Sequence, residues 1–227
     1  MKPGILLLAD SRLPTGGHSH SGGVETAVDT GMLSTLDDLA SFLRGRVRTA
    51  GPMLAGCAAA ACALATDGID HWAPWDTAVS ARILVPALRE ASRTQGAAML
   101  RSALRMWPTA PLLALRHLAR PHLPLVLGAA TAAAGGDPAE AAALALHHLI
   151  GGACSAAVRL LGLDPIDVAA TQARLAQLVE EVAVNACRAA GTAVSTVDQM
   201  RLPAEGGPMP DLHAVRHAHQ EVTLFAS

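Results

Sequence analysis

Residues 137–167 read DPAEAAALALHHLIGGACSAAVRLLGLDPID and contain the clearest helix signals in the chain. Asp137 can accept hydrogen bonds at a helix N-terminus, proline follows at the first helical position, and Glu140 stands at the third. Gly162 is a natural terminator because glycine adopts the left-handed conformation without strain. These signals predict one long helix over residues 138–161.

The same start signal recurs at Asp164-Pro165, which predicts a second helix directly behind the first. Because only a very short turn separates the two, we expect a long antiparallel helical hairpin. The expected apolar face of the second helix consists of Val168, Thr171, Leu175, Leu178, Val179, Val182 and Ala186.

A stripe of small residues lies inside the first of these helices, at residues 151–157. Gly151 and Gly152 each cost about 1 kcal/mol relative to alanine within a helix. We expect close approach of another helix to offset that cost. The approaching helix would come from this chain or from a second copy of it.

The composition indicates an all-α protein. About a fifth of the residues are alanine, the strongest helix former, whereas tyrosine is absent and isoleucine is scarce. The hydrophobic fraction of 51% is enough for a sizeable core in a chain of 227 residues. The net charge of -2 and the aromatic fraction of 2% argue against a nucleic-acid partner, which requires clustered cations and stacking rings.

The chain is expected to divide into two parts. Residues 1–201 predict a single-domain all-α helical bundle, in which residues 1–23 form a glycine-rich loop segment without helix. Residues 202–227 are rich in proline and glycine at first and then polar, which predicts a linker and a mobile C-terminal tail.

One helix of the bundle has a predicted start and a predicted end. Ser34 or Thr35 can cap it, with acidic residues three positions further on. Gly51-Pro52 should end it, because proline lacks the amide hydrogen that a helix interior needs.

The sequence does not predict export or membrane insertion. The apolar run at residues 5–9 is too short for a signal peptide. Uncharged windows at residues 49–66 and 141–158 consist mostly of small residues, which suit buried helices better than a membrane span. We expect a soluble cytoplasmic protein with no membrane partner. Its cysteines form no C-x-x-C pair and should be reduced, buried thiols: Cys57, Cys62, Cys154 and Cys187.

Motifs for catalysis and for metal binding are incomplete. No phosphate-binding loop, G-x-S-x-G elbow or H-E-x-x-H motif is present, so we expect no catalysis. A helical enzyme that uses Ser21 with His20 is an alternative, although adjacent residues seldom meet in the needed geometry. A metal carrier is a second alternative, because histidines cluster in the loop and in the tail. They are His18 and His20, and His213, His217 and His219.

Three arginines recur at helical spacing, Arg82, Arg89 and Arg93. They would share one face of a single helix. That face is either a solvated surface or a basic surface for an acidic partner.

Three segments carry the motifs of a known family. Residues 8–25 read LADSRLPTGGHSHSGGVE, residues 90–96 read EASRTQG, and the end of the chain contains Val215-Arg216-His217 and Leu224-Phe225-Ala226-Ser227. In this order and spacing they are similar to the D-S-x-x-P-x-G-x-x-x-H-S-x-G-L-E, A-S-R-x-x-G and M-R-H…L-F-x-S segments of the urease accessory protein UreF family. The resemblance covers nearly the whole chain.

The resemblance implies an all-α protein that dimerises and works without a cofactor of its own. It implies two bridging partners, the accessory protein UreD (also called UreH) and the nickel-carrying GTPase UreG. Docked on apo-urease subunits, such an assembly helps to insert nickel into the urease active site. A direct histidine-based nickel carrier is the alternative function.

The resemblance also implies a set of partner-binding residues at the two ends of the chain. His18 stands where the family usually has an aromatic residue, and with Arg216 it would shape the surface that receives the GTPase. Partner binding would order the tail against the N-terminal loop, at a backbone entropy cost of roughly 1–2 kcal/mol per residue. The full set is His18, His20, Ser21, Glu25, Arg216 and His217.

Overall fold

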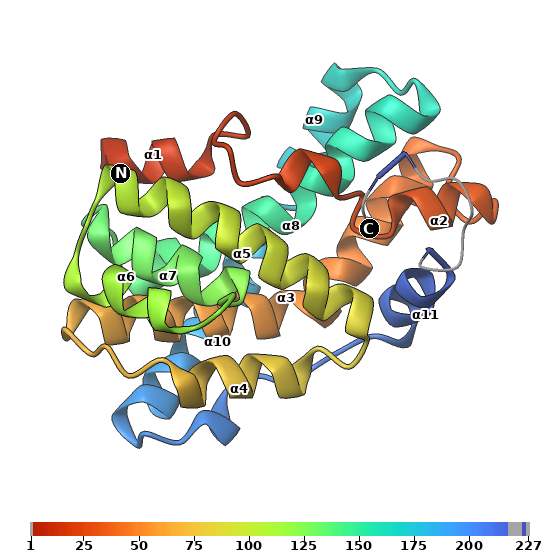
Figure 1. Ribbon diagram of the computed structural model, residues 1–227. Helices are drawn as coiled ribbons and strands as arrows, with labels where there is room; N and C mark the ends of the chain where they lie inside the picture. Colours follow the sequence, from red (N-terminus) through yellow and green to blue (C-terminus); the bar gives the residue numbers. More distant parts are fainter. Residues whose placement is uncertain (1, 218–223, 226–227) are drawn as a thin grey trace.

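The computed structural model describes residues 2–217 and 224–225, and these residues confirm the all-α prediction. They form α-helices and short 3₁₀ helices, with no strand in the described part (Figure 1). In chain order the elements are α1 Pro3–Ala9, η1 Gly17–Ser19, α2 Val24–Asp29, α3 Leu36–Thr66, α4 Ala73–Arg82, α5 Pro86–Met106, α6 Ala110–Ala114, η2 Leu115–His117, α7 Leu123–Ala133, α8 Pro138–Leu161, α9 Pro165–Ala173, α10 Ala176–Ser195, η3 Gln199–Arg201 and α11 Pro208–His217.

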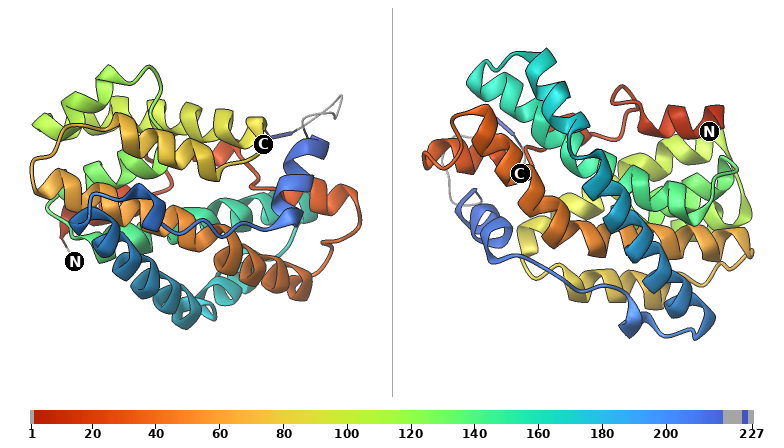
Figure 2. Two further views of the ribbon diagram at one scale, coloured as in Figure 1. Left: turned by 90° about the horizontal axis from the view of Figure 1, so that it is seen from below. Right: turned by 180° about the vertical axis from the view of Figure 1, so that it is seen from behind.

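Helix α3 runs through the middle of the bundle and packs against α7, α8 and α10, as Figure 2 shows from two sides. Its start is as predicted, since the Thr35 side chain accepts a hydrogen bond from the Asp38 amide and the Asp38 carboxylate accepts one from the Thr35 amide. Small side chains allow close packing along it. A Cβ on Gly128 of α7 would lie 2.1 Å from the Ala58 carbonyl oxygen, so the two backbones are in direct contact.

The predicted end of this helix at Gly51-Pro52 is wrong. Helix α3 continues through Pro52 to Thr66. Gly51 is buried, and a Cβ there would lie 2.9 Å from Leu146 Cδ2 of α8. Packing on three neighbouring helices therefore outweighs the hydrogen bond that the proline cannot donate.

The predicted hairpin is confirmed in its first arm and corrected in its second. Helix α8 has the Asp137–Glu140 capping box and ends at Gly162, which has φ +64°. The second arm is two helices, α9 and α10, that join at Leu175. Leu175 is buried in a cluster with residues of α2, α3, α8 and α9, and both α9 and α10 pack against α3 and α8.

Within the small-residue stripe of α8, the alanines pack in a buried cluster with α2 and α3, but the two glycines do not meet a helix. The His20 carbonyl oxygen is the nearest atom to the Cβ position of Gly152, at 3.8 Å. Gly151 has open space at its Cβ position. The expectation of a close helix at these glycines is therefore wrong within this chain.

The sequence predicts a loop without helix over residues 1–23, and this prediction is wrong for the first part of the segment. Pro3 begins α1, which buries Ile5 and Leu8 against the bundle. Two histidines of α8 hold its end, because the His148 Nε2 lies 2.9 Å from the Leu8 carbonyl oxygen and His147 bonds the next carbonyl. Burial of two apolar side chains makes this short segment helical.

The described part of the C-terminal segment is seated on the bundle. Helix α11 lies within the predicted linker and tail and packs against α2 (Figure 1). Phe225 joins the apolar cluster formed by α2, α3, α8 and α9. The mobility of the tail stays a prediction. The Arg82 side chain of α4 also holds the linker, because it donates hydrogen bonds to the carbonyls of Leu202 and Pro203.

Within the part of the chain that the structure describes, two helices are long and apolar enough to cross a membrane, α3 and α8. More than half of the apolar window of each is buried inside the bundle, 61% in α3 and 56% in α8. Both are surrounded by other helices, as the sequence predicts for these windows. The four cysteines are free, and only Cys187 is not fully buried.

Candidate functional site

The two ends of the chain meet around one carboxylate, that of Glu25 on α2. Its Oε2 lies 2.8 Å from His217 Nε2 of α11, and its two oxygens accept hydrogen bonds from the amides of Leu224 (2.6 Å) and Phe225 (3.2 Å). Glu25 is 4% exposed and His217 is 8% exposed. We call this meeting of residues 20–29, α11 and residues 224–225 the terminal junction.

The terminal junction contains most of the site residues that the sequence predicts. Glu25 and His217 are in direct contact, as stated. Ser21 is fully buried, and its Oγ accepts a hydrogen bond from the Gly23 amide at 3.3 Å. His20 is half-buried beside α8. Arg216 is exposed on α11.

The side chain of His18 lies outside the described part of the structure, although its backbone belongs to η1. Its contact with Arg216 therefore stays a prediction.

Sequence reasoning missed the α3 side of this junction. Phe42 and Arg46 lie one helical turn apart on α3, and the His213 ring of α11 stacks on Phe42 with 6.4 Å between ring centroids and 10° between planes. The Arg46 Nε is buried without a hydrogen-bond partner, and burial lowers the pKa of Arg46 to about 10. The spacing of Phe42 and Arg46 places them on one face. Nothing in the sequence shows that this face meets the tail.

The outer face of the junction combines exposed apolar side chains with two cations, Arg216 and Arg159, whose guanidinium lies 4.5 Å from the centre of the Phe225 ring. Leu212 and Val215 of α11 and Leu224 of the tail are 60%, 45% and 72% exposed, and Arg216 lies among them in the sequence. Exposed apolar groups beside a guanidinium are typical of surfaces that bind proteins, because such contacts are rich in arginine and apolar anchors.

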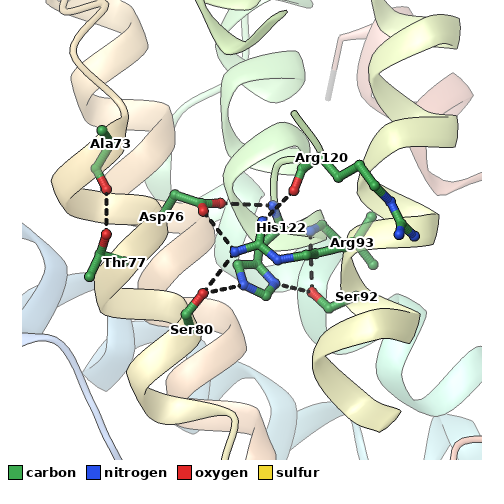
Figure 3. Close-up of polar contacts among 9 residues, drawn as sticks. Ala73, Asp76, Thr77, Ser80, Ser92, Arg93, Arg120 and His122 are labelled. Carbon is green, nitrogen blue, oxygen red and sulfur yellow. Dashed lines mark hydrogen bonds and ion pairs between the residues drawn. The ribbon is translucent and has the colours of Figure 1, made fainter. Parts of the chain in front are cut away.

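A second polar cluster joins α4, α5 and the segment before α7 (Figure 3). Arg93 NH2 donates to Asp76 Oδ2 at 3.0 Å and to Ser80 Oγ at 2.9 Å. The other Asp76 oxygen accepts the His122 backbone amide at 3.1 Å. The His122 ring lies between two hydroxyls, with Ser80 Oγ 2.8 Å from Nε2 and Ser92 Oγ 3.0 Å from Nδ1.

This cluster holds its histidine neutral. His122 is fully buried, and burial, together with the Arg93 charge, lowers its pKa to about 4. Because Arg93 donates to Ser80 Oγ, the Ser80 hydroxyl hydrogen is free to point at His122 Nε2. The ring then carries its hydrogen on Nδ1 and donates it to Ser92.

The cluster explains the family motif at residues 90–96 as a structural joint. Ser92 and Arg93 supply its hydrogen bonds, and Gly96 allows the close approach of the next segment. A Cβ on Gly96 would lie 2.1 Å from the Pro121 carbonyl oxygen. These residues position helices rather than present a reactive group.

An open cleft of about 550 Å³ borders this cluster, and its arginines bond to the protein itself. Arg89 donates to the carbonyls of Ile83 and Leu84, and Arg93 donates to that of Arg120. Arg82 belongs to α4, not to the helix that carries the other two. The expectation of one shared basic helix face is therefore wrong. The cleft is lined by Thr77, Ser80, Ala81, Pro86, Arg89, Glu90 and Arg93.

The predicted histidine metal sets are not assembled within the described residues. No group of three or more histidine, cysteine, aspartate or glutamate side chains there could hold a metal ion. His217 contacts Glu25 and His213 stacks on Phe42. His219 lies outside the described residues.

The comparisons with known proteins agree with the resemblance. The family model described as UreF matches residues 33–176. A urease accessory protein UreF of a Mycobacterium species (strain JLS) is 42% identical over 98% of this chain and 97% of its own length. The chain belongs to the UreF family. Proteins of the same name from Mycobacterium marinum and Mycobacterium tuberculosis are 40% and 39% identical over the same shares of each chain.

Family membership gives the three motif segments a common explanation. The opening and closing UreF segments are far apart in sequence, and both supply residues to the terminal junction through Glu25, His217 and Phe225. The middle UreF segment forms the joint around His122. The terminal junction, whose outer face is exposed, is therefore the candidate functional site.

Proposed function

We propose that this chain is a non-catalytic chaperone of urease maturation. It bridges UreD/UreH and the GTPase UreG on apo-urease and so supports nickel insertion into the urease active site. Membership in the UreF family and the name of its relatives, urease accessory protein, support a role in urease maturation. The chain acts in the cytoplasm and as a homodimer in this proposal.

One observation carries the proposal furthest, namely the terminal junction with its exposed outer face. Glu25 fixes α11 and the tail from within, through its contacts with His217, Leu224 and Phe225. This fixes where α11 presents Arg216. A rigidly presented guanidinium loses less conformational entropy when a partner binds it.

The apolar residues beside Arg216 support a protein partner rather than a small molecule. Leu212 and Leu224 expose most of their side chains. Covering such groups contributes about 25 cal/mol per Å² of apolar surface. A bridging chaperone needs surfaces of this kind and no reactive group.

Co-purification tests the proposal. The chain is mixed with UreD and UreG homologues from the same organism, and complexes are resolved by size exclusion with light scattering. We expect a ternary complex and a dimer of the free chain. Failure of the folded chain to form any ternary complex would contradict the bridging role.

Calorimetry with nickel separates this function from the alternative of a direct nickel carrier. The carrier requires binding at micromolar concentration by the free chain. The bridging role predicts no such binding, because His217 is already in contact with Glu25.

A further inference from the structure

His213 of α11 is an almost fully enclosed histidine whose ring nitrogens have no partner. It is 6% exposed, and neither Nδ1 nor Nε2 has a hydrogen-bond partner among the described residues. One face of the ring stacks on Phe42. Gly23, at φ +91°, lies against its edge, since a Cβ there would be 3.6 Å from Nδ1. The imidazole is therefore part of the interface that seats α11.

Two positive charges, those of Arg46 and Arg216, act on this ring. Helix α3 brings Arg46, and α11 itself carries Arg216, His217 and the acidic Asp211. Burial lowers the pKa of His213 from the usual 6.5, and the charges of both arginines lower it further. Helix α2 brings two acidic residues, Asp29 and Glu25, and the Glu25 carboxylate is bonded to His217 and to two tail amides.

Two further elements pack near the ring. Helix α5 packs against α11 and carries Arg89 and Glu90, which bond to carbonyls of residues 83–84 and to Arg120 respectively. The Gly22-Gly23 turn contributes no charge. No acidic side chain among the described residues is bonded to the His213 ring, so none of these residues compensates a proton there.

We propose that His213 makes the seating of α11 pH-sensitive, so that mild acid lifts the C-terminal helix and Arg216 off the bundle. A protonated imidazole at this position would place a buried positive charge close to those of Arg46 and Arg216. Burial of an unpaired charge is costly, and separation of α11 from α3 relieves it by returning the ring to water. The hydrogen bond that the Thr26 hydroxyl of α2 donates to the His213 carbonyl at 3.3 Å is broken by the same movement.

The direction of the effect follows from proton linkage. His213 has a lower pKa when α11 is seated than when its ring is in water, so the lifted state binds protons more readily. Seating is at full strength above about pH 6.5 and weakens progressively as the pH falls below that value. The property belongs to the free chain and does not depend on the proposed bridging function.

Nuclear magnetic resonance of the labelled full chain, titrated from about pH 8 to about pH 5, tests the proposal. The imidazole signals of His213 report its pKa, and the amides of Leu224 and Phe225 report the seated tail because both donate to Glu25. We expect a His213 midpoint below 6.5 and loss of the seated amide shifts over the same pH range.

Two replacements of His213 by neutral side chains test whether its protonation causes the loss of seating. His213→Phe keeps a ring against Phe42, and His213→Gln serves if the larger ring disturbs the fold. Both should keep the tail amides in their seated positions across the titration. His117→Gln, at an exposed position, should leave the wild-type response unchanged.

Removing the neighbouring charge gives an independent check. Arg46→Gln should raise the pKa of His213 and reduce the loss of seating in acid. Arg44→Gln, two residues earlier and exposed on the same helix, should have no effect. The proposal is overturned if His213 titrates at or above 6.5, if the tail stays seated after it titrates, or if the tail leaves equally in the His213 variants.

Discussion

Glu25 on α2 and His217 on α11 are 192 positions apart in the sequence, and their side chains lie 2.8 Å apart in a nearly closed environment. The same carboxylate accepts the amides of Leu224 and Phe225. One side chain thus joins the first and last family segments. Its loss should therefore loosen the whole tail rather than one contact.

Glu25→Gln should weaken this junction, because a neutral amide replaces the carboxylate that faces three hydrogen-bond partners. Loss of charge-assisted hydrogen bonds lowers the free energy of unfolding by about 1.5–3 kcal/mol. Urea unfolding measures that change, and hydrogen exchange of the Leu224 and Phe225 amides locates it. Glu180→Gln, at an exposed position of α10, is the control and should be near neutral.

Arg216→Ala should abolish GTPase recruitment while binding to UreD is retained. Arg216 is exposed, so the fold should change by less than about 0.5 kcal/mol in stability. Pull-down of each partner separately measures the two interactions. Arg188→Ala removes another exposed arginine, on α10, as the matched control. Equal recruitment by Arg216→Ala and wild type would refute this role.

Gly96→Ala should strongly destabilise the joint between α5 and the segment before α7. The new Cβ would lie 2.1 Å from the Pro121 carbonyl and 2.8 Å from the Leu123 amide nitrogen, both backbone atoms that cannot yield cheaply. We expect the free energy of unfolding, measured by thermal denaturation, to fall by about 1–3 kcal/mol or more.

Gly45→Ala is the control for that substitution. Gly45 lies inside α3 with no atom within 4 Å of its Cβ position. Alanine there should raise stability by about 0.5–1 kcal/mol, because it favours the helix. Similar losses in both variants would mean that close approach at Gly96 is not the cause.

Stability should fall in acid, in part through His122. The pKa of His122 is about 4 in the folded chain and 6.5 in the unfolded chain. Its contribution to the free energy of unfolding is therefore complete above pH 6.5 and declines toward pH 4. The full difference corresponds to roughly 3 kcal/mol. Urea unfolding at several pH values should give a shallower pH dependence for His122→Gln than for wild type. His117→Gln, at an exposed position, should keep the wild-type slope.

Local signals predicted helix starts well and helix ends poorly. The capping boxes at Thr35–Asp38 and Asp137–Glu140 occur as expected, because a cap is satisfied within four residues of itself. The predictions of a helix end at Gly51-Pro52 and of a continuous second arm through Leu175 are wrong, because both features depend on which helices pack alongside.

The sequence by itself determined the all-α class, the long helix α8 and membership in the UreF family, because alanine content, caps and short motifs are local properties. Only the tertiary structure decided that Glu25, His213, Arg46 and the tail share one site. Their chemistry depends on distances and burial between α2, α3 and α11, and residues so far apart in the chain are brought together only by packing of the whole bundle.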